Sequence, residues 1–137
     1  MKSAIFEKAG LVTIQEIEKP KLQANDDVTI KIVRACVCGS DLWSYAHGDN
    51  KEAHSINDGH EAIGIVEEIG TEITTVKPGD FVIVPFTHGC GECEACRSGF
   101  DGTCDRHQGF TNWSNGFQSE YIRFHYANWA LIKIPGQ

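Results

Sequence analysis

Four cysteines lie close together in the sequence, at a spacing that suits a metal ion. Cys90, Cys93, Cys96 and Cys104 follow the pattern Cys-x2-Cys-x2-Cys-x7-Cys. Four thiolates this close are the ligand set of a closed, tetrahedral structural zinc site. The alternatives are two disulfides or four unrelated thiols. Disulfides are typical of small secreted chains, and the N-terminal residues do not read as a signal peptide, so the spacing favours zinc.

A second set of metal-binding residue types lies upstream of the four cysteines. Cys38 ends a strand-like run, and Gly59-His60-Glu61 follows further along the chain. A mixture of sulfur and imidazole ligands favours zinc, and a catalytic zinc uses three protein ligands and keeps one position open. Cys38 and His60 would be two of those ligands, Glu61 adjoins them, and Asp41 could hold the second nitrogen of His60. Considered alone, His60 could be an ordinary polar loop residue, and Cys38 could be a small residue of the core.

Short strands must position these residues. Seven runs are rich in Val, Ile and Phe and are separated by Gly and Pro, which predicts an all-β barrel or sandwich. Alternation along one run predicts that Val28 and Ile30 face the core while Thr29 faces away. One short helix is expected after Ser40, which would cap it. The predicted strands cover residues 3–6, 11–17, 27–36, 62–69, 81–84, 119–125 and 130–134.

The bulk properties indicate one domain in a reducing compartment. The chain has 137 residues, and its net charge of −7 argues against nucleic acid as a partner. No apolar run approaches the roughly 18 residues of a membrane helix. Six cysteines with no expected signal peptide predict a cytoplasmic protein with free thiols. Among them, Cys36 is expected to be buried and inert, the alternative being a spare thiol near the metal.

Three motifs, in order, resemble those of a known family. Residues 59–82 read GHEAIGIVEEIGTEITTVKPGDFV, residues 38–41 read Cys-Gly-Ser-Asp, and the four cysteines span 90–104. This order resembles zinc-dependent alcohol dehydrogenases of the medium-chain dehydrogenase/reductase superfamily. The resemblance implies that residues 1–137 form the N-terminal catalytic domain, mainly β. Its expected fold is a GroES-like, partly open β-barrel with a few short helices and a zinc-binding lobe at about 88–107.

The resemblance also implies roles for single residues. The family links oxidation of an alcohol, or reduction of an aldehyde or ketone, to NAD(P), with zinc as Lewis acid. Cys38 and His60 would be zinc ligands, and Glu61 would lie behind the zinc as an interchangeable ligand or a salt-bridged carboxylate. Ser40 would pass the alcohol proton towards solvent, and Asp41 would support the site. Where many relatives have a relay histidine this chain has Trp43, which would line an apolar substrate pocket or pack in the core.

No dinucleotide fingerprint occurs in these residues. The string that begins at Gly89 lacks the third glycine, and no βαβ unit surrounds it. The family's third catalytic ligand and its Rossmann cofactor domain would follow residue 137. We therefore expect an N-terminal lobe of a longer enzyme, inactive alone, with an incomplete catalytic site and NAD(P) bound only by the parent protein. A homo-oligomer is left open. The alternative function is a non-catalytic, stand-alone zinc-binding β-barrel.

Overall fold

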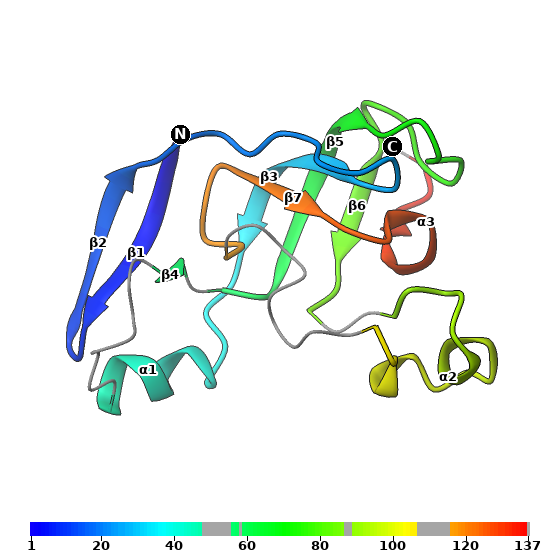
Figure 1. Ribbon diagram of the computed structural model, residues 1–137. Coiled ribbons are helices and arrows are strands. Elements are labelled where there is room, and N and C mark those ends of the chain that lie inside the picture. The colour runs from blue at the N-terminus through cyan, green and yellow to red at the C-terminus, as the bar shows by residue number, and fades with distance from the viewer. Residues whose placement is uncertain (48–55, 58, 87–88, 107–115, 137) are drawn as a thin grey trace.

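Two antiparallel sheets form the frame of the protein in a computed structural model that describes residues 1–47, 56–57, 59–86, 89–106 and 116–136 (Figure 1). The smaller sheet has the order β2-β1-β4, and the larger has the order β7-β3-β5-β6-β8. The strands are β1 (Lys2–Lys8), β2 (Leu11–Glu16), β3 (Val28–Ala35), β4 (Ile56–Asn57), β5 (Ala62–Ile69), β6 (Phe81–Val84), β7 (Tyr121–Phe124) and β8 (Ile132–Lys133).

Four short helices lie outside the sheets. They are α1 (Asp41–His47), α2 (Glu94–Arg97), the 3-10 helix η1 (Asp101–Thr103) and α3 (Ala127–Ala130). The loop with α2 and η1 stands to one side of the larger sheet, and α1 lies near the smaller one (Figure 1). The prediction of a mainly β chain with few short helices is confirmed.

The two sheets are joined where β1 passes the segment before β7. Ser3 and Ser119 form an isolated bridge, and the N–H of Ala4 donates to the carbonyl of Gln118 at 2.9 Å. Within the described residues the strands do not close into one continuous ladder. This agrees with the predicted partly open barrel. The two sheets meet along one edge, at Ser3 and Ser119, and are not paired along the other.

The core lies against the larger sheet. Its largest fully buried side chains come from the central strands and from the chain around β7. Each such apolar side chain stabilises the fold by about 1.5–3 kcal/mol when it leaves water. They are Val28, Ile30, Val66, Val82, Val84, Phe117, Ile122 and Phe124.

The structure corrects the sequence predictions at several points. Thr29 is 1% exposed instead of facing solvent, because β3 lies between β5 and β7 and is covered at that end. Cys36 is exposed, since it lies just past the end of β3, whose last residues are themselves exposed. The predicted strand 130–134 is confined to Ile132–Lys133, because α3 occupies the chain up to Ala130 and Leu131 caps that helix. The predicted strand 119–125 is shorter, at Tyr121–Phe124.

Close backbone packing explains two glycines of the 59–82 motif. A Cβ added to Gly64 on β5 would lie 2.6 Å from the carbonyl oxygen of Lys31 on the paired strand β3. A Cβ on Gly70 would overlap the carbonyl oxygen of Asn25. Neither position has room for a larger side chain, so both require glycine. The two glycines therefore mark where β5 and the residue after it lie against β3 and the segment before β3.

Candidate metal centres

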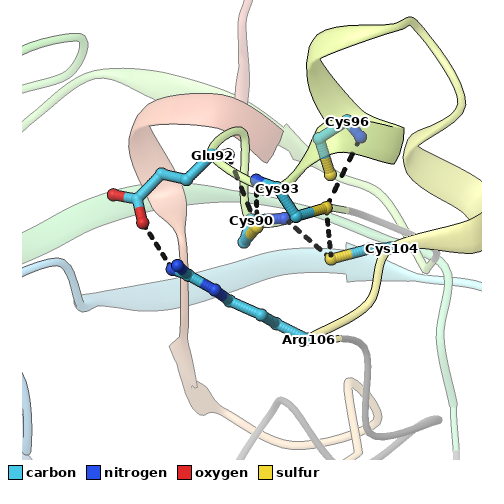
Figure 2. A network of polar contacts seen from close by, with 6 residues as sticks. All are labelled: Cys90, Glu92, Cys93, Cys96, Cys104 and Arg106. Atoms are coloured by element: carbon cyan, nitrogen blue, oxygen red, sulfur yellow. Dashed lines mark hydrogen bonds and ion pairs between the residues drawn. The ribbon is translucent and has the colours of Figure 1, made fainter.

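The four cysteines of the 90–104 loop converge on one point. Their sulfur atoms all lie within 4.8 Å of one another, and they point towards a shared centre (Figure 2). Cys90, Cys96 and Cys104 are buried, and Cys93 is half-buried. Cys93 is the N-cap of α2, which brings Cys96 back towards it within one helical turn. The sequence spacing therefore produces a compact, largely buried set of four donors.

Backbone N–H groups point at these sulfurs. The N–H of Cys90 donates to Cys104 Sγ and that of Cys93 to Cys90 Sγ, both at 3.4 Å, and the N–H of Cys96 donates to Cys93 Sγ at 3.5 Å. The donation from Cys96 is the largest of the contributions that lower the pKa of Cys93, to about 6. Burial has the opposite effect and raises the pKa of Cys96. These donors stabilise sulfur as thiolate, the form that binds metals.

The four-sulfur set fits zinc better than disulfides. All six cysteines are free thiols, and Cys93 Sγ and Cys104 Sγ are 3.9 Å apart. A disulfide needs about 2.05 Å between sulfurs, whereas four thiolates around one point match a tetrahedral structural zinc site. Arg106 and Glu92 form an ion pair beside the loop (Figure 2). The four sulfurs thus surround a space that a zinc ion would fill.

A second donor set joins the end of β3 to the start of β5. Ligand atoms of Cys38, His60 and Glu61 lie within 4.8 Å of one another. Cys38 and His60 are half-buried and Glu61 is exposed. The N–H of Cys36 donates to the carbonyl of Glu61 at 3.0 Å, continuing the β3–β5 pairing beyond the strands. Sheet pairing therefore brings these residues together, and the mixed thiolate, imidazole and carboxylate donors suit zinc.

Asp41 and Ser40 surround the imidazole of His60. Asp41 Oδ1 lies 3.1 Å from His60 Nδ1, although this approach is not an aligned hydrogen bond. Asp41 Oδ2 accepts the N–H of Cys38 at 2.8 Å and Nε2 of Gln118 at 3.5 Å. Ser40 Oγ lies 3.1 Å from His60 Nε2. The carboxylate thus faces one ring nitrogen and leaves Nε2 on the side of the hydroxyl.

Apolar side chains are exposed around this second set. Val37 is 66% exposed and Trp43 70% exposed, and Phe86 lies with its ring centroid 5.6 Å from that of His60. The interpretation of Trp43 as a core residue is wrong, because α1 presents it to solvent. His88 and His107, at the ends of the predicted zinc lobe, lie outside the described residues. The site is therefore open and bordered by apolar surface.

Sequence reasoning missed a third group of metal-binding residue types. Ligand atoms of Asp26, Asp27 and His125 lie within 4.8 Å of one another. Asp26 and Asp27 precede β3 and His125 follows β7, so only the antiparallel pairing of these strands brings them together. No motif spacing signals this group. The one available clue was that two predicted strands begin or end at these residues.

Comparison with known proteins identifies the family. Residues 24–136 match the alcohol dehydrogenase GroES-like domain. The chain belongs to this family. It is 36% identical over 150 residues to a zinc-type alcohol dehydrogenase-like protein of Bacillus subtilis, covering 98% of this chain and 39% of that protein. It is also 36% identical to an alcohol dehydrogenase of Geobacillus stearothermophilus, covering 98% of this chain and 40% of that protein.

Solved structures agree with this GroES-like membership. The alcohol dehydrogenase TADH from Thermus sp. ATN1 superposes with a TM-score of 0.89 at 33% identity, covering 99% of this chain and 40% of that one. The apo form of zinc-dependent alcohol dehydrogenase 2 from Streptococcus pneumonia gives a TM-score of 0.86, also at 33% identity. The match covers 98% of this chain and 39% of that one. The chain thus spans about 40% of the length of these alcohol dehydrogenase relatives. In the described part of the GroES-like chain, no helix is long and apolar enough to cross a membrane.

Proposed function

We propose that residues 1–137 form the catalytic domain of a zinc-dependent alcohol dehydrogenase. The reaction is the NAD(P)-linked oxidation of an alcohol, or the reverse reduction of an aldehyde or ketone. The observation that carries this proposal is the convergence of Cys38, His60 and Glu61 next to a hydroxyl and a buried carboxylate. A module whose metal served only folding would need the four-cysteine loop and no second, open donor set.

Cys38 and His60 would hold a catalytic zinc, with Glu61 as a third donor. Bound there, zinc supplies a Lewis acid for the substrate oxygen. The chain's own contribution is orientation: Asp41 faces His60 Nδ1, which leaves Nε2 for the metal. Carboxylate partners of this kind fix the ring and raise the basicity of the ligating nitrogen. Because Glu61 is exposed, exchange of this carboxylate with other ligands would cost little.

Ser40 would move the substrate proton. Its Oγ lies 3.1 Å from His60 Nε2, so it is within reach of an alcohol oxygen held beside that nitrogen. Ser40 is exposed at the start of α1, and a proton accepted by its Oγ can leave to solvent. Asp41, 8% exposed, keeps His60 oriented while this happens. The exposed Trp43 and Phe86 would line the apolar part of a small alcohol's binding site.

The four-cysteine loop would hold a structural zinc. Its lobe would span about residues 88–107, and four sulfur ligands, three of them buried, would leave no coordination position for a substrate. A closed four-thiolate site contributes folding free energy instead of reactivity. The lobe is tied to the sheet through Tyr126, which packs against the sulfur cluster, and through Trp129, whose ring would meet a Cβ at Gly91 at 2.8 Å.

The remaining parts of the proposal follow from chemistry. NAD or NADP would bind a Rossmann domain outside residues 1–137, because these residues contain no phosphate-binding glycine loop. The partner is a small alcohol or carbonyl compound, and a net charge of −7 disfavours nucleic acid. Six free thiols suit the cytoplasm, where thiols stay reduced. A homo-oligomer would be compatible with the exposed apolar residues.

The test is a nicotinamide absorbance assay on the complete protein with a panel of primary and secondary alcohols. Cys38→Ser and His60→Ala should each abolish turnover, and Ser40→Ala should lower it by ~10²–10⁴-fold. Cys36→Ser is the matched control, because Cys36 is an exposed thiol outside the donor set. Full activity in His60→Ala would refute the catalytic assignment. Two zinc ions retained with no turnover of any alcohol would favour the non-catalytic zinc module.

A further inference from the structure

Gln118 lies in the segment that joins the two sheets, just before β7. In Figure 1 this segment runs between the smaller sheet and β3. The carbonyl of Gln118 accepts the N–H of Ala4 on β1 at 2.9 Å, and the N–H of the preceding Phe117 donates to the carbonyl of Gly59, also at 2.9 Å. Phe117 is fully buried. The backbone at Gln118 is therefore held both by β1 and by the residue before His60.

The side chain of Gln118 crosses Gly59 and reaches Asp41. A Cβ added to Gly59 would lie 2.5 Å from Cγ of Gln118 and 3.2 Å from its Cδ, so the glutamine stem occupies the space that a larger residue would fill. Nε2 of Gln118 lies 3.5 Å from Asp41 Oδ2. Because a carboxylate only accepts hydrogen bonds, the amide must present its NH₂ group here. A side chain from a distant segment is thus directed at the carboxylate that faces His60.

We infer that Gln118 is a positioning residue for the metal that Cys38 and His60 would hold, an inference that rests on the proposed function. Asp41 Oδ2 accepts the N–H of Cys38 at 2.8 Å and the more distant Gln118 amide. Both contacts are on Oδ2, so Oδ1 is left facing His60 Nδ1, at 3.1 Å. Gln118 therefore restricts rotation of the carboxylate and, through it, the orientation of the imidazole ring.

The strength of the contact sets the size of the expected effect. At 3.5 Å the approach of Gln118 is weaker than the 2.8 Å bond from Cys38. Asp41 is buried and Gln118 half-buried, so water replaces the lost amide only in part. Removing a group that directly contacts a ligand typically lowers metal affinity ~10–100-fold, and Gln118 is one contact further away, so we expect a loss of ~3–10-fold.

A purely structural role for Gln118 is the competing explanation. Its backbone joins β1 to the segment before β7, and that role needs no side-chain amide. Gln118→Leu separates the two explanations, because leucine keeps an aliphatic stem beside Gly59 and removes the NH₂ group. Gln118→Asn keeps the amide but is one methylene shorter, so its nitrogen no longer reaches Asp41. Both variants should bind metal more weakly only if the amide positions Asp41.

The probe is Co²⁺, loaded into the complete protein after zinc has filled the four-cysteine loop, then withdrawn with a chelator of known affinity. Sulfur-to-cobalt absorption reports occupancy, because Cys38 is the sulfur donor of this set. Gln118→Leu and Gln118→Asn should each lower the Co²⁺ affinity ~3–10-fold. In the zinc-loaded protein, the ¹⁵N NMR signals of the His60 ring should shift or broaden in both variants, because the ring is held less firmly. A purely structural role would leave these signals unchanged.

The matched control is Gln15→Leu. Nε2 of Gln15 donates to Glu7 Oε1 at 2.9 Å, so this variant removes a contact of the same kind that involves no member of the donor set. Its Co²⁺ affinity should equal that of the wild type. Equal affinity in Gln118→Leu as well would overturn the inference. A lower melting temperature of Gln118→Leu with unchanged Co²⁺ affinity would overturn it too, in favour of the structural role.

A double variant tests whether Gln118 acts through Asp41. Gln118→Leu should add less than ~2-fold to the loss caused by Asp41→Asn, whereas losses that multiply would show that the two side chains act independently and would overturn the inference. The same titrations separate this inference from the proposed function. If the wild type shows no sulfur-to-cobalt absorption at this set, the proposed catalytic metal and the inference both fail. If all variants bind Co²⁺ as the wild type does, only the inference fails.

Discussion

Replacing Asp41 with asparagine tests whether the carboxylate prepares His60 for a metal. Two donors and one imidazole nitrogen approach this side chain: the N–H of Cys38 at 2.8 Å, Nε2 of Gln118 at 3.5 Å, and His60 Nδ1 at 3.1 Å. An amide has the same shape but offers one acceptor oxygen and one donor nitrogen. Asp41→Asn must therefore leave either Cys38 or His60 facing an N–H group, and it removes the negative charge from the imidazole.

The expected loss is ~10–100-fold in metal affinity at the Cys38–His60 set, which corresponds to about 1.4–2.7 kcal/mol. Asp41 is 8% exposed, so solvent compensates little for the lost contact. The assay loads Co²⁺ into protein that already holds zinc at the four cysteines, then withdraws it with a chelator of known affinity. Sulfur-to-cobalt absorption reports occupancy, because Cys38 is the sulfur ligand of this set.

The control is Glu68→Gln, which removes one exposed carboxylate near the far end of β5, away from His60. Its cobalt affinity should equal that of the wild type. If Asp41→Asn binds cobalt as tightly as Glu68→Gln does, the carboxylate does not prepare the ring and the reasoning fails. A lower melting temperature with unchanged cobalt affinity would give Asp41 a purely structural role at the start of α1.

Three further substitutions test the frame around the site. Cys96→Ser should remove one equivalent of tightly bound zinc, measured by elemental analysis, because a closed site cannot spare a buried ligand. Gly70→Ala should lower the free energy of unfolding by about 1–3 kcal/mol in urea, since its Cβ overlaps Asn25. A hydrogen bond from Lys133 lowers the pKa of Asp80. Asp80 therefore stabilises the fold above its unfolded pKa of about 3.9, and Asp80→Asn should flatten the fall of melting temperature below it.

Each of these three predictions has a matched control variant and an outcome that would contradict it. Cys36→Ser should keep the zinc that Cys96→Ser loses. If both variants lose the same amount of zinc, binding depends on the number of thiols and not on the four-cysteine site. Gly102→Ala has nothing within 4 Å of the added Cβ, so a cost equal to that of Gly70→Ala would refute the overlap argument. Asp101→Asn removes an exposed carboxylate. If the melting temperature of Asp101→Asn falls as little at low pH as that of Asp80→Asn, the contact with Lys133 does not explain the effect.

Local patterns in the sequence predicted seven of the eight strands that the structure describes, missing the two-residue β4, and did not predict how the strands pair. The runs that became β5 and β6 are rich in branched apolar residues, and their bounds agree with the structure. Alternation failed at Thr29, because a central strand covered at one end is buried on both faces. The helix α3 was missed because four residues carry too weak a periodic signal. Bounds follow from local composition, whereas burial depends on neighbours from distant parts of the chain.

The donor groups show the same division between local and distant information. The spacing of Cys90, Cys93 and Cys96 alone predicted a converging set, because one turn and α2 bring them together. Cys38 and His60 were paired by resemblance to a family, since their convergence depends on β3 meeting β5. The group at His125 carries no motif, and only the register between β3 and β7 brings its members together.

This difference has a physical consequence for assembly of the domain. The four-cysteine loop closes over a short stretch, with Cys90 and Cys104 separated by 14 positions, so its closure costs little chain entropy and bound zinc can order it early. The Cys38–His60 set gains its geometry from the sheet, because the contact from Cys36 to Glu61 exists only once β3 and β5 have paired. Metal binding there must follow sheet formation and report on it. The local site therefore stabilises the lobe, whereas the long-range site depends on the paired strands of the larger sheet. This suits the proposed catalytic metal, whose ligands must be fixed before substrate arrives.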